Sequence, residues 1–404
     1  MEWDSFLRPC VGRMQAYQPG LREEQIRELV SGAEIYKLSS NESPLPPFPE
    51  ALVAMSEALG RLNEYPEGSS HRLRAALAEH YGVAPEQILV GNGTNELLTL
   101  IAEACLEPGD NVVYGWPSFV VYRYSAQLLG AEYREVALGT NGAFDLDALL
   151  ERIDRRTKIV YICSPNNPTG VCVSATALDD FLRRVPRQVL VVFDAAYDEF
   201  VTCGFGGAAV LAAGGATVTP TTAAPAPNAA ARGIAIHAAA PPAPAPAAPL
   251  AYFDGTRPFV VLKTFSKAYA LAGIRVGFGF APKPLVEAVE RVREPFNVNT
   301  VAQAAAIASL AGGDELERRC ALNAAGRERL EAGFAELGLK FFPSQANFVW
   351  VEVPDAEHAF DQLLRRGIIV RPFPAGGGLR VGVGDAAGVN RTLEVFRELF
   401  GGSQ

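Results

Sequence analysis

The chain has 404 residues, 49% hydrophobic and 20% charged, a composition typical of a globular protein rather than a disordered or coiled-coil one. Its formal net charge of −9 argues against general nucleic-acid binding, because a phosphate backbone requires clustered Lys and Arg. The six cysteines are scattered without the paired spacing of zinc-binding or disulfide-rich small domains, so we expect no metal site. The length favours two domains.

No stretch of the sequence qualifies as a membrane span, which needs about 20 mostly apolar residues. The first residues lack the basic and apolar regions of a signal peptide. We therefore expect a cytoplasmic protein without a membrane partner.

Short apolar runs rich in β-branched residues alternate with longer helical patterns along the chain. Buried strands are predicted over 87–90, 111–114, 159–163, 189–193 and 259–262, and helices over 71–81 and 95–105. Each run is continuous and bounded by Gly, Pro, Asn or Asp, as in strands buried on both faces of a largely parallel sheet. This alternation predicts an α/β fold with helices on both faces of the sheet.

The first motif, Gly91-Asn92-Gly93-Thr94-Asn95-Glu96, follows a predicted strand and opens a helix. Backbone N–H groups at a helix N-terminus bind anions. Glu96 stands where a dinucleotide fingerprint has its third glycine, so a single phosphate is favoured over a dinucleotide. An ordinary capped turn, with Thr94 or Asn95 as the cap, is the alternative.

Two further motifs, Ser164-Pro165-Asn166-Asn167-Pro168-Thr169-Gly170 and Phe193-Asp194-Ala195-Ala196-Tyr197, lie at the ends of predicted strands. Ligands of open α/β sheets bind outside the carboxyl ends of the strands. The paired asparagines could aim one amide at a ligand, or they could form a plain turn. Asp194 is either a helix N-cap or the charge partner of a cationic ligand atom.

The strongest signal runs from Thr264 to Arg275 and places Lys267 near the end of a predicted buried strand. Desolvation there would lower the pKa of the lysine and make its neutral amine available for a Schiff base. The hydroxyls of Thr264 and Ser266 and the guanidinium of Arg275 would clamp a phosphate. A solvated Lys-Arg turn is the alternative.

The segment 202–250 interrupts this pattern. It is almost entirely Ala, Pro, Gly and Thr, and Arg232 is its only formally charged residue. Stretches of this kind are lids or disordered insertions, and we expect a flexible insertion that protrudes and is cut first in limited proteolysis. Its flanks, 191–200 and 259–267, should still pair in the sheet.

Together the four motifs resemble the class I/II aminotransferases of fold-type I, which use pyridoxal 5′-phosphate, and within them the histidinol-phosphate aminotransferases. Further matching pieces are found at 17–20, 38–42, 65–68, 344–348 and 370–381. The resemblance implies a large domain over 46–291 with a mostly parallel sheet flanked by helices and a smaller α/β domain over 292–404. The arm 1–45 would join the small domain. Two features depart from the family: Ala195 replaces a common glutamate, and the insertion lengthens the interval between Asp194 and Lys267.

The resemblance also implies a role for each site residue. Lys267 would form the Schiff base and move the proton, Asp194 would pair with the ring nitrogen, and Asn167 and Tyr197 would bind the phenolic oxygen of the ring. The remaining cofactor contacts would come from Gly93, Thr94, Asn95, Phe119, Thr264, Ser266, Arg275 and, from the neighbouring subunit of a homodimer, Tyr65. The substrate would meet Tyr17, Asn41, Arg371 and Arg380.

The expected reaction is transamination between histidinol phosphate and 2-oxoglutarate, which yields imidazole-acetol phosphate and glutamate in histidine biosynthesis. An aromatic amino-acid aminotransferase is the alternative, since Arg380 could bind a phosphate or a carboxylate. A phospho-amino-acid decarboxylase and an inactive protein that binds pyridoxal 5′-phosphate also stay open.

Overall fold

The structure is a computed structural model that describes residues 6–12, 14, 16, 27, 30, 34–201, 248–373 and 376–402. Tyr17 and residues 202–247 of the predicted insertion lie outside the described residues. Within the described ranges, every helix is too short or too polar to cross a bilayer.

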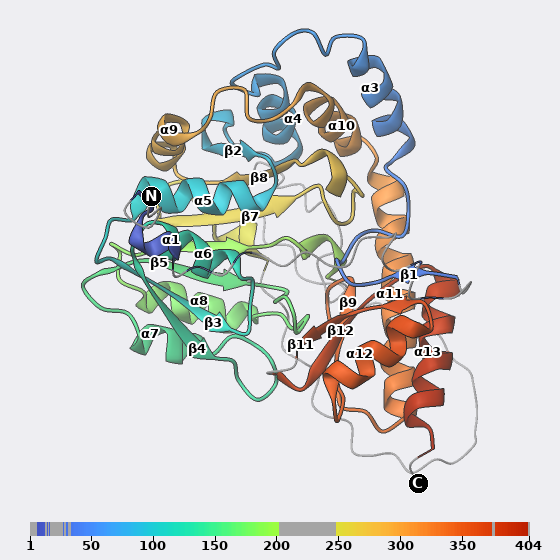
Figure 1. The fold of residues 1–404 in the computed structure, drawn as a ribbon. Helices are drawn as coiled ribbons and strands as arrows, with labels where there is room; N and C mark the ends of the chain where they lie inside the picture. Colours follow the sequence, from blue (N-terminus) through green and yellow to red (C-terminus); the bar gives the residue numbers. More distant parts are fainter. Residues whose placement is uncertain are drawn as a thin grey trace, which may run out of the picture.

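The chain alternates strands and helices through most of its length (Figure 1). The first part contains α1 (Pro9–Gly12), β1 (Tyr36–Lys37), α3 (Pro49–Leu59), α4 (His71–Tyr81), β2 (Ile88–Gly91), α5 (Thr94–Cys105), β3 (Asn111–Trp116), α6 (Val121–Leu128), β4 (Glu132–Ala137), α7 (Leu146–Glu151), β5 (Thr157–Cys163), α8 (Ala175–Arg184) and β6 (Leu190–Asp194). The second part contains β7 (Phe259–Thr264), β8 (Gly277–Phe280), α9 (Lys283–Val292), α10 (Thr300–Leu310), α11 (Gly313–Glu336), β9 (Phe348–Glu352), α12 (Ala356–Arg365), β10 (Ile368–Ile369), β11 (Arg371–Phe373), β12 (Gly378–Gly382) and α13 (Ala386–Phe400). Short 3₁₀ turns include η3 (Asp198–Phe200) and η5 (Ala272–Ile274).

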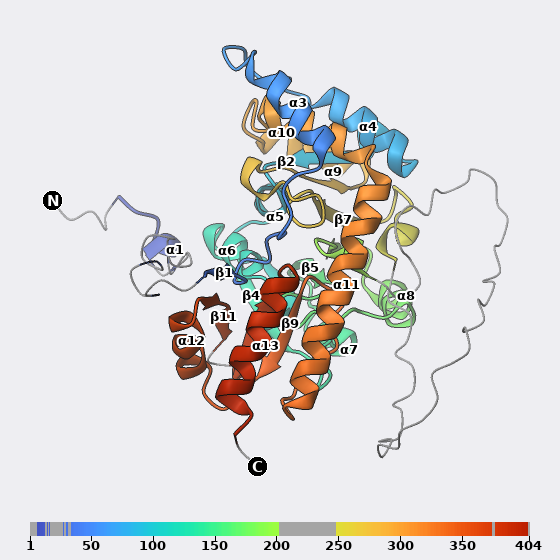
Figure 2. The same ribbon diagram turned by 90° about the vertical axis from the view of Figure 1, so that its right-hand side faces the viewer.

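A seven-stranded sheet forms the centre of the larger unit, in the order β2-β8-β7-β6-β5-β3-β4. The strands from β7 to β4 pair in parallel, whereas β8 is antiparallel to both of its neighbours. Helices α5 and α6 lie on one side of the sheet, and α7 and α8 on the other (Figure 2). Right-handed crossovers require this division. The connection from β3 to β4 runs toward the edge of the sheet, whereas the connections from β4 to β5 and from β5 to β6 run back toward its centre, so their helices lie on opposite faces. The predicted α/β class with a mostly parallel sheet is confirmed.

Strands β6 and β7 lie at the centre of the sheet, and every residue in both is buried. Their apolar runs, 190–193 and 259–262, are typical of strands covered on both faces. They pair in register from Val191 opposite Phe259 to Asp194 opposite Leu262. The prediction that the segments flanking the insertion remain paired is therefore confirmed for 191–194 and 259–262, whereas residues 195–200 and 265–267 lie beyond the two strands. The fold brings Asp194 beside the strand that leads to Lys267.

A second, smaller unit follows, in which β9, β11 and β12 form an antiparallel sheet in the order β11-β12-β9. Helices α11, α12 and α13 accompany this sheet (Figure 1), and the unit has its own buried apolar cluster. Strand β1 pairs with β10, with Tyr36 opposite Ile368, so this part of the predicted arm 1–45 is attached to the smaller unit.

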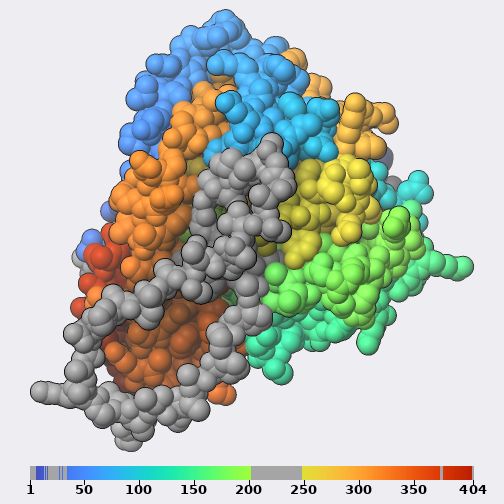
Figure 3. All heavy atoms as spheres, turned by 180° about the vertical axis from the view of Figure 1, so that it is seen from behind, coloured from blue at the N-terminus to red at the C-terminus, as the bar shows by residue number. Residues whose placement is uncertain are grey.

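Helix α10 packs against α3 and α4. Figure 3 shows the blue segment that contains α3 and α4 lying against orange parts of the chain on the rear face. Its residues Ala302, Ala305 and Ala306 belong to the same buried cluster as the seven-stranded sheet. The predicted boundary at residues 291 and 292 stays a prediction, and these contacts favour a boundary nearer to α11.

Candidate active site

The carboxyl ends of four parallel strands meet at one edge of the sheet and open into a cavity of about 350 Å³. In α/β sheets this edge is where ligands bind. Most of the residues that the sequence singles out line the cavity: Asn41, Thr94, Asn95, Phe119, Asn167, Asp194, Tyr197, Thr264, Ser266, Lys267, Arg275, Arg371 and Arg380. Motifs far apart in the sequence thus form one site.

Asp194 is the last residue of β6, and its carboxyl is almost fully buried, with 2% of the residue exposed. Burial raises its pKa to about 6. The hydroxyl of Tyr122 donates to Oδ2 at 2.8 Å, and the Ala196 N–H donates to Oδ1 at 3.2 Å. Among the described residues it has no ion-pair partner, so a cationic ligand atom would meet a buried acid that lacks one.

Lys267 lies three residues beyond the end of β7 and is partly buried. Burial, followed by the positive charge of Arg380, lowers the pKa of Lys267 to about 8. Its Nζ donates to the carbonyl oxygen of Ser40 at 3.2 Å and lies 5.8 Å from the centre of the Tyr197 ring. A lysine in this state supplies a neutral amine at mildly alkaline pH.

Tyr197 is joined to the chain before α3 through Asn41, whose Nδ2 donates to the tyrosine hydroxyl at 3.0 Å. Burial raises the pKa of Tyr197 to about 12, so the hydroxyl keeps its proton. Asn41 has φ of 53° and is held there by Asn347, whose Nδ2 donates to the Asn41 carbonyl at 3.0 Å. Within the described residues, Asn41 Oδ1 is buried without a hydrogen-bond partner, which leaves an acceptor available to a ligand.

The two neighbouring asparagines have different surroundings. Asn166 is fully buried, accepts from Ser118 at 2.8 Å and donates to Thr169 Oγ1 at 3.1 Å, so it braces the turn. Asn167 lines the cavity, and its Oδ1 accepts from Arg380. Only Asn167 therefore presents its amide to a ligand.

A cradle for an anion lies where α5 begins. Gly93 has φ of 80° and precedes Thr94, the first residue of the helix. Arg275 Nη2 donates to the Asn92 carbonyl at 3.2 Å, and Nη1 lies 3.4 Å from Ser266 Oγ. A Cβ at position 93 would lie 2.5 Å from Arg275 Nη2, so only glycine allows the guanidinium this close. Helix N–H groups, a hydroxyl and a guanidinium together suit a phosphate.

Arg371 and Arg380 lie opposite each other on β11 and β12, and both line the cavity. Arg380 donates to Asn167 Oδ1 and to the carbonyl oxygen of Ser39. Its guanidinium also lies 5.4 Å from the Phe348 ring centre and 5.9 Å from that of Phe373. The smaller unit thus contributes two positive charges and the Phe373 ring to a cavity whose other residues come from the larger unit and the segment before α3.

The predicted residues Tyr65 and Tyr17 are not among the described residues that line the cavity. Phe119 lines the cavity, where its ring meets that of Tyr122 edge to face at 5.8 Å. Tyr65 is 83% exposed, stacks on Phe296 at 4.7 Å and is not among the described residues that line this cavity. Tyr17 lies outside the described residues.

The sequence reasoning missed two kinds of contact. Tyr122 binds Asp194 but was not singled out, although it lies three residues after Phe119 and hence close to it on the first turn of α6. The carbonyls of Ser39 and Ser40 accept from Arg380 and Lys267, and a backbone acceptor has no residue signature in a sequence.

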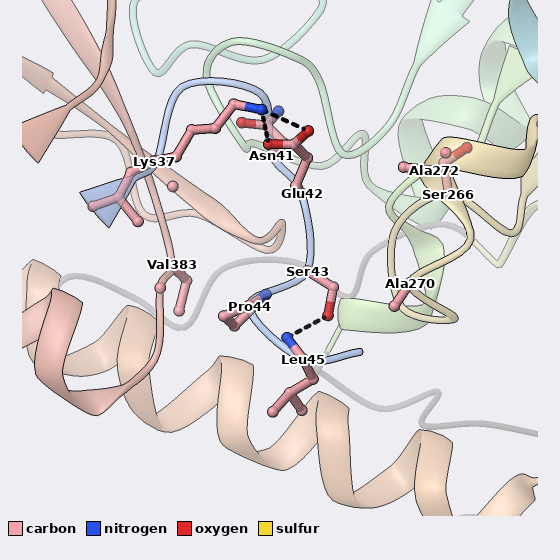
Figure 4. Close-up of a pocket in the computed structure, with 14 residues that line it drawn as sticks. Lys37, Asn41, Glu42, Ser43, Pro44, Leu45, Ser266, Ala270, Ala272 and Val383 are labelled. Atoms are coloured by element: carbon pink, nitrogen blue, oxygen red, sulfur yellow. Dashed lines mark hydrogen bonds and ion pairs between the residues drawn. The ribbon is translucent and has the colours of Figure 1, made fainter. Parts of the chain in front are cut away.

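A second cavity of about 370 Å³ adjoins the first and shares Asn41, Glu42, Ser266 and Ala272 with it. Figure 4 shows the segment from Lys37 to Leu45 on one side and Ala270 and Ala272 on the other. Lys37 and Glu42 form an exposed ion pair of 3.1 Å at this place. The second cavity extends the site along the segment that precedes α3.

Comparison with known proteins agrees with this geometry. The family model for aminotransferase class I and II matches residues 33–396. A histidinol-phosphate aminotransferase of Moorella thermoacetica is 37% identical, over 97% of this chain and 92% of its own length, and one of Methylobacillus flagellatus is 40% identical, over 95% and 94%.

Among solved structures, the histidinol-phosphate aminotransferase of Sinorhizobium meliloti in complex with pyridoxal-5′-phosphate is 27% identical, with a TM-score of 0.79 over 98% of both chains. Its cofactor has a ring nitrogen and a phosphate, the groups for which Asp194 and the α5 cradle are suited. This chain therefore belongs to aminotransferase class I and II and is a transferase dependent on pyridoxal 5′-phosphate.

Proposed function

We propose that this enzyme moves an amino group between histidinol phosphate and 2-oxoglutarate, giving imidazole-acetol phosphate and glutamate in histidine biosynthesis. The observation that carries the proposal is the pair Arg371 and Arg380, which lines the same cavity as Lys267 and Asp194. The substrate named for the relatives has a phosphate, and 2-oxoglutarate has a second carboxylate, so both need a cationic site away from the reacting carbon.

The cofactor would be held by the groups already described. Asp194 would face the ring nitrogen, Asn167 and Tyr197 the phenolic oxygen, and Phe119 the ring face. The phosphate contacts would be Gly93, Thr94, Asn95, Ser266 and Arg275, with Thr264 close behind. When bound, the cofactor supplies an electron sink for the pair left at the substrate carbon.

Lys267 would hold and move the proton at the reacting carbon. Its lowered pKa of about 8 supplies neutral amine at mildly alkaline pH, which a general base requires. The Ser40 carbonyl holds Nζ inside the cavity, close to the Tyr197 ring. Asn41, whose Oδ1 has no hydrogen-bond partner in the described part of the chain, would line the substrate side, as would Tyr17, which lies outside that part.

A homodimer would complete the site. Exposed apolar side chains gather on α3 and the chain that follows it, at Leu52, Val53, Leu59, Leu62 and Tyr65, and Phe296 stacks on Tyr65. Such a surface suits a second copy of the chain. Tyr65 would then reach the phosphate in the other subunit.

Subunit mixing tests the shared site. Tyr65→Ala and Lys267→Ala proteins, each impaired alone, should recover activity when mixed, because one site of each mixed dimer keeps both residues. Failure to recover activity, with mixed dimers shown by native mass spectrometry, would place Tyr65 outside the site. The cytoplasmic location expected from the sequence stays a prediction.

A half-reaction screen tests the substrate. The loaded protein is mixed separately with histidinol phosphate, glutamate, phenylalanine or tyrosine, and the visible absorption of the bound cofactor is followed. We expect histidinol phosphate and glutamate to bleach the band and Lys267→Ala protein to give no response. Bleaching by phenylalanine but not by histidinol phosphate would favour an aromatic amino-acid aminotransferase instead.

A further inference from the structure

Asp194 is hydrogen-bonded by a residue, Tyr122, that is not among the described residues lining the cavity. Tyr122 on α6 is fully buried, and its hydroxyl donates to Asp194 Oδ2 at 2.8 Å across 72 positions of sequence. The other oxygen, Oδ1, accepts the Ala196 N–H at 3.2 Å. A carboxylate bound on both oxygens cannot rotate freely about its Cβ–Cγ bond, so the direction of its remaining lone pairs is set.

The Tyr122 ring is itself held on three sides by aromatic rings. It stacks on Tyr161 with centroids 4.6 Å apart and planes 8° apart, and it meets Tyr114 edge to face at 5.7 Å. Phe119, which lines the cavity, meets it edge to face at 5.8 Å. The hydroxyl therefore has little freedom to follow the carboxylate if the carboxylate turns.

The hydroxyl also suits the charge state that the acid needs. A hydroxyl donor stabilises a carboxylate over a carboxylic acid without adding a positive charge that would compete with a cationic ligand atom. Burial pushes the pKa of Asp194 up, and the bond from Tyr122 pulls it down. A guanidinium or ammonium in place of Tyr122 would satisfy the acid before the ligand arrives.

We infer that Tyr122 is a positioning residue, which holds Asp194 ionised and aimed so that the site binds a protonated ring nitrogen in preference to an uncharged ring atom. The inference rests on the role given to Asp194 above and is independent of the substrate. It predicts an effect on cofactor recognition before any reaction takes place.

The experiment compares two ligands of the apoenzyme: pyridoxal 5′-phosphate and its 1-deaza analogue, in which a carbon replaces the ring nitrogen. The ratio of their dissociation constants is measured for the wild type and for Tyr122→Phe. Because a ratio is taken on one preparation, the folded fraction cancels. Tyr122→Phe removes a hydrogen bond to a charged group, so we expect the preference for the natural cofactor over its analogue to fall about tenfold.

Tyr161→Phe is the matched control. Its hydroxyl is buried and, among the described residues, has no hydrogen-bond partner, and its ring belongs to the same stack. Losing that hydroxyl should leave the ratio at the wild-type value. Asp194→Asn closes a double-mutant cycle, because Tyr122→Phe should change the ratio little once the carboxylate is absent.

Three results would overturn the inference. One is a wild-type ratio in Tyr122→Phe, and another is an equal loss in Tyr161→Phe, which would indicate general loosening of the aromatic stack. The third is a wild-type enzyme that binds both ligands equally well, which would remove the role of Asp194 and that of Tyr122 with it. None of these depends on whether histidinol phosphate is the substrate.

Discussion

Arg371 and Arg380 are directly opposed partners on the antiparallel strands β11 and β12, so their side chains leave the sheet on the same face. Two like charges placed this close repel each other unless an anion lies between them. Arg380 is restrained by Asn167 and Ser39, which fixes one guanidinium of the pair in the cavity.

Removing either arginine should weaken the binding of both substrates. We expect Arg380→Gln and Arg371→Gln to raise the KM for the amino donor and for 2-oxoglutarate, by about 10- to 100-fold for Arg380, because each charge-assisted hydrogen bond contributes about 1.5–3 kcal/mol. Steady-state kinetics measures this. Arg391→Gln, on α13 and paired with Glu394, is the control and should leave both constants unchanged.

The capture of the cofactor by the apoenzyme should depend on pH through Lys267. Because burial and Arg380 lower its pKa to about 8, the neutral amine increases as the pH rises toward 8 and changes little beyond 9. Stopped-flow absorbance should show the rate rising with that midpoint. In Arg380→Gln the midpoint should move up. A wild-type rate that keeps climbing past pH 10, as for an ordinary lysine, would contradict the lowered pKa.

Asp194 should make the apoenzyme less stable as the pH rises. Its pKa is raised in the folded state, so the stability it contributes is present below about pH 4 and is lost as the pH rises through about 6. The shift corresponds to about 3 kcal/mol. Asp194→Asn should therefore raise the apoenzyme Tm at pH 8 relative to the wild type and have less effect near pH 4.

In the enzyme with bound cofactor, we expect Asp194→Asn to have the opposite effect on the Tm. With a cationic ring nitrogen beside it, the carboxylate is favoured, and Asp194→Asn should lower the Tm. The variant should bind the cofactor but lose most activity. Full activity in Asp194→Asn would remove the reason for pairing this residue with the ring nitrogen.

Lys263, inside β7, should be essential for stability rather than for chemistry. Its Nζ contacts Asp198 at 2.8 Å and Glu199 at 3.0 Å, and its side chain is only 7% exposed. Lys263→Met would leave two carboxylates in or near the core without their cation, at a cost of about 3–5 kcal/mol. Glu199→Gln should cost less, because Lys263 keeps Asp198. Thermal unfolding of both variants measures the difference, and equal losses would contradict this account.

The helices and strands that the sequence predicts well are those with a clear local pattern of apolar and polar residues. The helix expected over 71–81 is α4 (His71–Tyr81), and the strand expected over 159–163 lies within β5 (Thr157–Cys163). Strand β3 runs two residues beyond the expected end, because Gly115 resembles a turn residue although it and Trp116 continue the pairing with β4. Motifs at strand ends fall together because parallel strands share an edge.

The features that the sequence does not predict depend on contacts between residues far apart in the chain. Strands β1 and β10 have two residues each, and only their contact with each other makes them strands. A sequence offers two asparagines, Asn166 and Asn167, and only packing shows which one is used inside the turn. In the sequence, Tyr122 is one residue of a helical pattern, and only the structure shows that its hydroxyl donates to Asp194.

One strand and the turn that follows it hold two lysines four positions apart, and the fold gives them opposite reactivity toward aldehydes. Asp198 and Glu199 keep Lys263 protonated against the effect of burial, and a protonated amine cannot attack a carbonyl. Lys267 has a lowered pKa and lies at the cavity wall. A small aldehyde followed by reduction should therefore label Lys267 and spare Lys263, so the enzyme selects one of two adjacent amines by their electrostatic surroundings.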